Sequence, residues 1–216
     1  GTPLGGLIQD HMISGVKISM RGRFFNKEDY QQLVYQGLST KLGNIKLLPP
    51  SIIKPIQLWS DKQIFSTIIL NIIPAGKAAL NLKSTAKIGV RSWQSQKPRQ
   101  WHFGGSEIKD DSMSEAEVIF RQGQLLVGVL DKNHYGATPY GLVHCMYELY
   151  GGDVSTKLLS SLTLLFTSFL QSEGFTLGVH DILVVEKADK ERTKIIKESR
   201  LIGRKITCQV LDIPED

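Results

Sequence analysis

Apolar residues recur at helical spacing in the first part of the chain. This spacing predicts a short helix from Gly5 to Ser14. A second helix is expected to begin after Asn26, because asparagine is a favourable N-cap residue. Its predicted end is Gly37, because glycine readily adopts the left-handed conformation that terminates helices.

The third predicted helix has start and stop signals at both ends. Three prolines between Leu47 and Leu58 favour an extended segment ahead of it. Ser60 and Gln63 then have the spacing of a capping box, and Pro74 marks the end of the helix. Its expected buried face consists of Ile64, Phe65, Ile68 and Ile69.

The pattern changes to strand-like between Leu80 and Leu130. Residues Ala86 to Trp93 alternate loosely, which predicts a strand. Glu117–Arg121 and Leu125–Leu130 flank a Gln-Gly-Gln turn and predict a β-hairpin. The polar stretch over residues 94–114 is expected to be a long surface loop.

The remainder of the sequence is predicted to be helical. Thr138 precedes Pro139, an arrangement typical of a helix start, and the helix is expected to end at Tyr150. Asp153 is the expected N-cap of a longer helix through Gln171. Its apolar residues recur at three and four positions and are expected to form a buried face: Val154, Leu158, Leu162, Leu165, Phe166 and Phe169. The charged segment after Glu186 favours a solvated helix, which Gly203 is expected to interrupt.

These elements predict an α+β fold in two parts. Residues 1–135 would hold helices and the hairpin, and residues 136–216 would be helical. Hydrophobic residues make up 41% and charged residues 22% of the 216 residues, which is typical of a globular protein. The apolar stretches are too short to span a bilayer. Since the chain lacks an initiator methionine and a signal peptide, we expect it to be an excerpt of a longer protein.

Charge and chemistry restrict the function only weakly. The net charge of +5 suits an anionic partner such as a nucleotide or RNA, although an ordinary solvated surface explains it equally well. Two separate cysteines and the absence of zinc-finger spacing favour a reducing compartment and no metal site. His144 and Cys145 are adjacent on a predicted helix and therefore diverge by about 100°, which disfavours a catalytic dyad.

Several polar residues lie at the ends of predicted elements, where capping or solvation is the default explanation. They are Gln9, Asp10, Lys54, Lys62, Gln63, Lys132 and Asp181.

Five sequence blocks resemble, in order, the largest subunits of multisubunit RNA polymerases. The first is GLIQDHM, beginning at Gly6, which resembles the segment after the metal-binding NADFDGD loop of that family. The second runs from Pro50 to Ile64 and is similar to P-x-I-x-K-P-x-x-L-W-S/T-G-K-Q, with Asp61 in place of the usual glycine. The others are Gly123–Lys132 and the pair GLVH and GFTLGVHD. The resemblance covers about residues 4 to 190.

Within that family, two segments look most like the RNA polymerase I paralogue. They are LVHCMYELYGG, from Leu142 to Gly152, and GFTLGVHDIL, from Gly174 to Leu183. Polymerases II and III differ at several of these positions, but their largest subunits remain alternatives. A polymerase-derived interaction or RNA-binding module without catalytic function is a further alternative.

The resemblance implies a pore-like domain over residues 1–135 and a funnel-base region over 136–216. Together they would form walls of the secondary channel, which admits nucleoside triphosphates, backtracked RNA and a cleavage factor. The implied partners are other polymerase subunits, including the second-largest subunit and a cleavage-type zinc-ribbon subunit, with DNA and RNA bound through the whole enzyme. Magnesium would be bound outside this segment, and the isolated fragment would be inactive. A class-I enzyme would make ribosomal RNA in the nucleolus.

The same resemblance implies roles for five residues, none of them catalytic. Gln9 and Asp10 would support the active centre from behind, and Lys132 would project toward the channel and attract triphosphate. Lys62 and Gln63 match a pair in the family motif, although Gln63 has a second explanation as a capping-box partner.

Overall fold

The computed structural model describes residues 3–93 and 115–214, and it confirms the α+β fold class. The chain forms two compact units, residues 1–174 and 175–216. The expected division between residues 135 and 136 falls inside the first unit. There α5 (Leu142–Tyr150) contacts both α4 (Lys132–Tyr135) and α6 (Gly152–Glu173).

Among the residues of the first unit that the structure describes, the strands form two small antiparallel sheets. β1 (Phe24–Phe25) pairs with β2 (Trp59–Ser60). The larger sheet has the order β3 (Leu82–Thr85), β4 (Glu117–Arg121), β5 (Gln124–Val127). The hairpin prediction is therefore confirmed, with an irregularity in pairing between Ile119 and Phe120.

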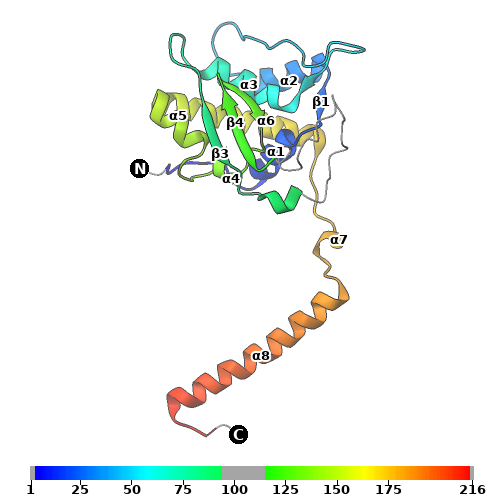
Figure 1. Ribbon diagram of the computed structural model, residues 1–216, viewed down its shortest axis with the longest axis vertical. Coiled ribbons are helices and arrows are strands. Elements are labelled where there is room, and N and C mark those ends of the chain that lie inside the picture. The colour runs from blue at the N-terminus through cyan, green and yellow to red at the C-terminus, as the bar shows by residue number, and fades with distance from the viewer. Residues whose placement is uncertain (1–2, 94–114, 215–216) are drawn as a thin grey trace, which may run out of the picture. The chain divides into compact units, whose positions relative to one another are not determined.

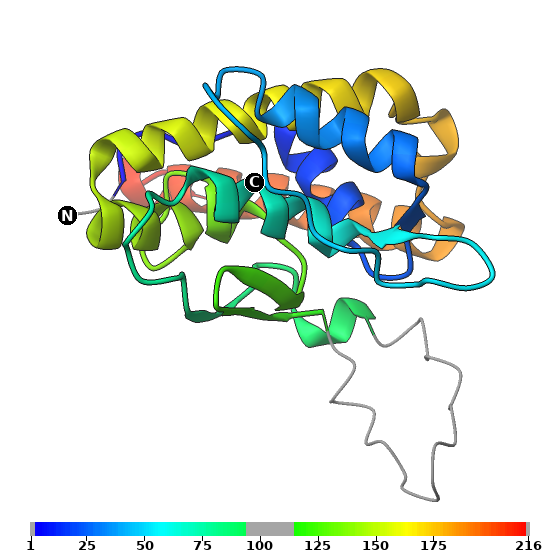
Figure 2. The same cartoon turned by 90° about the horizontal axis from the view of Figure 1, so that it is seen from above.

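The helix α3 (Asp61–Ile72) lies at the centre of the first unit. One side contacts β5, and other contacts join α3 to α2 (Lys27–Gly37) and α6 (Figures 1 and 2). The predicted apolar faces of α3 and α6 are buried, which confirms both. The largest fully buried side chains include Tyr30, Phe65, Ile68, Ile69, Tyr135, Phe166 and Phe169.

Local signals set the boundaries of α2 and α3 correctly. The Asn26 side chain accepts a hydrogen bond from the Asp29 amide at 2.7 Å, and the capping box of α3 is present. The predicted role of Gly37 is wrong, because its φ is not left-handed. A Cβ there would lie 3.0 Å from Ile68 Cδ1, so the glycine instead permits close helix packing.

The first helix was predicted too early. α1 runs from Asp10 to Ser19, and the segment before it is not helical. The Leu7 amide donates to the Tyr135 carbonyl at 2.7 Å, so a tertiary contact takes the place of the first helical turns. Gln9, the N-cap residue of α1, has a φ of 51°.

Three further predictions of local structure were wrong. The predicted strand over Ala86 to Trp93 is absent, since β3 ends at Thr85 and Val90–Trp93 form a 3₁₀ helix. Thr138 does not cap α5, which begins after Gly141. The Thr138 hydroxyl instead donates to the carbonyls of Lys132 and Asn133, both at 3.1 Å. It thereby supplies a partner to carbonyl groups of α4. Asp153 lies in the first turn of α6, whose N-cap is Gly151.

The second unit holds α7 (Val179–Ile182) and α8 (Glu186–Leu211). The interruption predicted at Gly203 is wrong, because α8 continues through it. Exposed apolar residues on α8 include Ile195, Ile202 and Ile206. None of the described helices is long and apolar enough to cross a membrane. The predicted loop over residues 94–114 lies outside the described residues.

Candidate functional site

Lys62 is largely buried at the start of α3 rather than exposed on a surface. Its side chain is 11% exposed, and its ammonium donates to Glu115 Oε2 at 2.7 Å and to the Ser19 carbonyl at 2.8 Å. The Ser19 hydroxyl in turn accepts from the Leu130 amide at 3.0 Å. Lys62 therefore links the end of α1 to the segment before β4. Through its hydroxyl, Ser19 also links the end of α1 to Leu130, just before α4.

Asp61, which takes the place of the usual glycine, lies beside this ion pair. Its Oδ2 atom is 3.8 Å from the Lys62 ammonium and has no hydrogen-bond partner. Burial raises the pKa of Asp61 to about 6, and the attraction of Lys62 only partly offsets that effect. At neutral pH the charged Asp61 carboxylate is therefore buried without a cation or hydrogen bonds that fully offset the cost of its burial.

Gln63 fixes the proline-containing segment to the N-terminus of α3. Its Oε1 atom accepts from the Ser60 amide at 3.0 Å and the Ser51 hydroxyl at 2.6 Å. Its Nε2 atom donates to the Pro49 carbonyl at 2.8 Å. These contacts confirm the capping-box explanation and use both ends of the amide.

Gln9 and Asp10 are exposed where the chain enters α1. The Leu7 amide and the Met12 carbonyl, on either side of them, are bonded to Tyr135 of α4. The structure thus brings the first sequence block next to the turn that carries Lys132. The Lys62–Gln63 pair lies instead at the N-terminus of α3.

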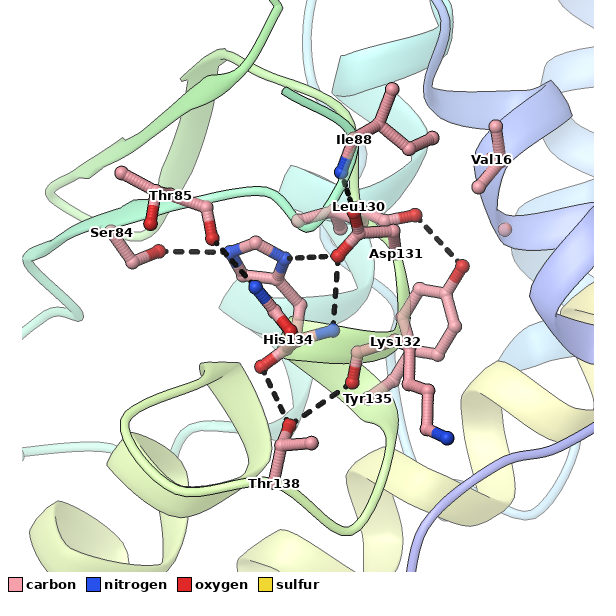
Figure 3. A network of polar contacts seen from close by, with 12 residues as sticks. Val16, Ser84, Thr85, Ile88, Leu130, Asp131, Lys132, His134, Tyr135 and Thr138 are labelled. Carbon is pink, nitrogen blue, oxygen red and sulfur yellow. Dashed lines mark hydrogen bonds and ion pairs between the residues drawn. The ribbon is translucent and has the colours of Figure 1, made fainter. Parts of the chain in front are cut away.

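Lys132 is exposed and is the first residue of α4, a single helical turn. Its side chain points away from the buried polar residues around it (Figure 3). Among the residues the structure describes, no hydrogen bond or ion pair involves its ammonium. The ammonium can therefore meet an anionic ligand without first breaking a described ion pair.

A buried polar network surrounds the backbone of this turn (Figure 3). Asp131 accepts from the Asn133 amide at 2.9 Å and from the Ile88 amide at 3.0 Å. His134 Nε2 lies 2.8 Å from Ser84 Oγ on β3, and His134 Nδ1 lies 3.5 Å from Asp131 Oδ1. The second distance is long for a hydrogen bond, so that contact is mainly electrostatic.

The electrostatics of Asp131 favour its charged form. Burial opposes ionisation, but the contact with the His134 ring and the hydrogen bonds from the Ile88 and Asn133 amides outweigh it and hold the pKa of Asp131 below its usual value. No sequence motif pointed to this network. Its only local signal is the Asp-x-x-His spacing, and Ser84 comes from a distant strand.

The Ser84, His134 and Asp131 side chains are of the types found in hydrolytic triads. The His134 ring is 0% exposed, however, and lies between a strand and a helical turn. A nucleophilic triad needs an imidazole that can exchange protons with a bound substrate. The arrangement therefore serves to hold β3 and α4 together.

His144 and Cys145 do not form a catalytic pair. His144 Nδ1 accepts from the Tyr140 amide at 2.9 Å, and its Nε2 atom lies 3.5 Å from Glu148. Cys145 is half-buried, and burial raises the pKa of its thiol, which disfavours the nucleophilic thiolate. Within the described ranges, no group of three or more His, Cys, Asp or Glu side chains is placed to hold a metal ion.

Known proteins resemble this chain along its whole length. Residues 1–182 match the family model described as RNA polymerase Rpb1, domain 3. The DNA-directed RNA polymerase I subunit RPA1 of Drosophila melanogaster is 60% identical over 216 residues, which cover 100% of this chain and 13% of that protein. The corresponding rpa1 subunit of Dictyostelium discoideum is 41% identical, covering 99% of this chain and 12% of that protein.

A third relative extends the similarity to yeast. The DNA-directed RNA polymerase I subunit RPA190 of Saccharomyces cerevisiae is 38% identical over 221 residues, covering 100% of this chain and 12% of that protein. The chain thus spans about one-eighth of the length of these relatives. Because the family match extends over residues 1–182, the chain belongs to the RNA polymerase Rpb1 domain 3 family.

Proposed function

We propose that this chain is part of the largest subunit of DNA-directed RNA polymerase I and forms walls of its secondary channel. The observation that carries this proposal is the 60% identity to a polymerase I subunit along the entire chain. The other relatives compared above are also named as polymerase I subunits. In this role the segment controls the access of nucleotides, backtracked RNA and a cleavage factor during ribosomal RNA synthesis.

The geometry supports different roles for the five candidate residues. Lys62 and Gln63 are used within the fold, by a buried ion pair and by a helix cap. Gln9, Asp10 and Lys132 are exposed. A lysine ammonium on an anchored turn is a suitable attractant for an entering triphosphate. Lys132 is therefore the proposed contact, and Gln9 and Asp10 support the neighbouring surface.

The remaining parts of the proposal concern the whole enzyme. Polymerisation takes place outside this segment, at magnesium held by residues that precede it, and the isolated segment is inactive. The proposed neighbours are the second-largest subunit and a cleavage-type zinc-ribbon subunit. The proposed location is the nucleolus.

The test of the channel role is Lys132→Glu in the complete polymerase. Lys157→Glu, at an exposed position of α6, makes the same charge change and serves as the control. Reversal at Lys132 is expected to raise the apparent KM for nucleoside triphosphates about fivefold and leave elongation at saturating nucleotide nearly unchanged. Equal losses at low and saturating nucleotide, or equal effects of the two variants, would rule out a role in nucleotide entry.

The polymerase class is tested separately by chromatin immunoprecipitation of the protein that contains this segment. Concentration on the ribosomal RNA repeat is the expected result. Occupancy of messenger or transfer RNA genes would instead indicate polymerase II or III, and absence from all gene bodies would indicate an interaction module.

A further inference from the structure

The backbone that carries Lys132 is fixed far more firmly than a single helical turn can be by itself. Helix nucleation is unfavourable, and an isolated turn such as α4 is not stable in water. Its position must therefore come from contacts with other elements. Those contacts determine where the Lys132 ammonium can reach.

Asp131 and His134 provide contacts on one side of the turn. The Asp131 carboxylate caps α4 through the Asn133 amide and holds the Ile88 amide at the same time. His134 is completely buried and joins α4 to β3 through Ser84 Oγ at 2.8 Å. The network therefore ties both ends of the turn to the segment that begins at β3.

The other side of the turn is packed so closely that only glycine fits. A Cβ atom on Gly136 would lie 2.5 Å from the Lys132 carbonyl oxygen, and a Cβ on Gly141 would overlap the Asn133 carbonyl oxygen. The Thr138 hydroxyl donates to both of these carbonyls. Lys132 thus combines a backbone held on both sides with an exposed side chain.

We propose that Asp131, His134 and Ser84 are positioning residues that direct the Lys132 ammonium toward the entering triphosphate. This inference rests on the proposed role of Lys132 in nucleotide entry. The three residues are not catalytic residues, because Asp131 and His134 are buried, Ser84 is half-buried, and all three act only through the turn they hold. Misplacing a fixed charge by a small distance weakens its interaction with an anion while leaving the chemical step intact.

The test uses the complete polymerase and measures KM and kcat separately. Ser84→Ala removes the partner of His134 Nε2 and is milder than His134→Ala, which also opens a cavity. Each is made alone and together with Lys132→Met. We expect each single variant to raise the apparent KM for nucleotide roughly threefold to tenfold, with kcat changed less than about twofold. In the Lys132→Met background, neither variant is expected to raise KM further.

Three outcomes would overturn the inference. They are an unchanged KM in Ser84→Ala, a KM increase that persists without Lys132, and a fall in kcat or assembled enzyme with no change in KM. The last of these would indicate a purely structural network. If Lys132→Met alone leaves KM unchanged, the channel role itself fails. If it raises KM while Ser84→Ala does not, only the positioning role fails.

Discussion

At the scale of single residues, adjacent members of one motif have different physical roles. Lys62 is largely buried and pairs with the buried Glu115, whereas the charge of Asp61 beside it is buried and only partly offset by Lys62. A buried ion pair is expensive to break, because removal of one partner leaves the other charge without compensation. The Lys62–Glu115 pair therefore holds α3 to the segment before β4.

We predict that Lys62→Met destabilises residues 1–174 by about 3–5 kcal/mol, because Glu115 is left charged and buried. The double variant Lys62→Met with Glu115→Leu should recover a large part of this loss. Urea unfolding of the wild type, both single variants and the double variant measures the coupling free energy between Lys62 and Glu115. Strictly additive effects would show that the two side chains act independently.

Asp61 gives a second prediction, which concerns pH. Its pKa is about 6 in the folded chain, above the ordinary value of 3.8. Between these values the folded state retains a proton that the unfolded state has released, so the contribution of Asp61 to stability falls as pH rises from about 4 to 6 and is constant above. Asp61→Asn should therefore stabilise residues 1–174 at pH 7 by roughly 1–3 kcal/mol.

The difference in unfolding free energy between the wild type and Asp61→Asn isolates this effect from other titrating groups. That difference is expected to be smallest near pH 4 and to grow toward pH 6. A difference that is independent of pH would show that Asp61 is ionised normally in the folded chain.

At the scale of elements, the contact between α1 and α4 shows why some boundaries could not be predicted. Gly15 lies in the middle of α1, where a Cβ atom would overlap the Tyr135 hydroxyl. That hydroxyl donates to the Leu130 carbonyl at 2.7 Å and the Met12 carbonyl at 3.2 Å. Burial raises the pKa of Tyr135 well above its usual value, so the hydroxyl remains a donor.

Glycine-to-alanine substitutions should therefore have opposite effects in two helices. Gly15→Ala is predicted to destabilise residues 1–174 by about 2 kcal/mol or more, because the Tyr135 hydroxyl must move from its buried bonds. Gly203→Ala in α8 has open space around its Cβ and should stabilise that helix by about 1 kcal/mol. Urea unfolding of residues 1–174 tests the first effect, and the helicity of a peptide of α8 tests the second.

If Gly15→Ala proved neutral, α1 and α4 would not be packed as described. If Gly203→Ala failed to raise the helicity of the peptide, the continuity of α8 through Gly203 would be contradicted.

Elements with strong local signals could be predicted from the sequence, and those fixed by distant contacts could not. Asn26, the Ser60–Gln63 capping box and the apolar face of α6 are local features, and they gave correct helices. The beginning of α1 depends on hydrogen bonds to Tyr135, and α4 depends on Thr138 and Asp131. Such tertiary contacts outweigh local preference.

At the scale of the whole molecule, the candidate site was predicted only in part. The resemblance to polymerase largest subunits pointed to Lys132, which is exposed. It also pointed to Lys62, whose buried partner Glu115 is 53 residues away in sequence and carries no motif. The Asp131–His134–Ser84 network was missed because β3 and α4 come together only in the folded chain.

The most direct test of the central claim is photocrosslinking from position 132 in the complete elongation complex. A photoreactive side chain replaces Lys132, or Lys157 as the control, and radiolabelled nucleoside triphosphate is added. Our account predicts a nucleotide adduct at position 132, reduced by Ser84→Ala, and none at position 157. Absence of an adduct at position 132, or equal adducts at both positions, would contradict the claim that this segment lines the path of the entering nucleotide.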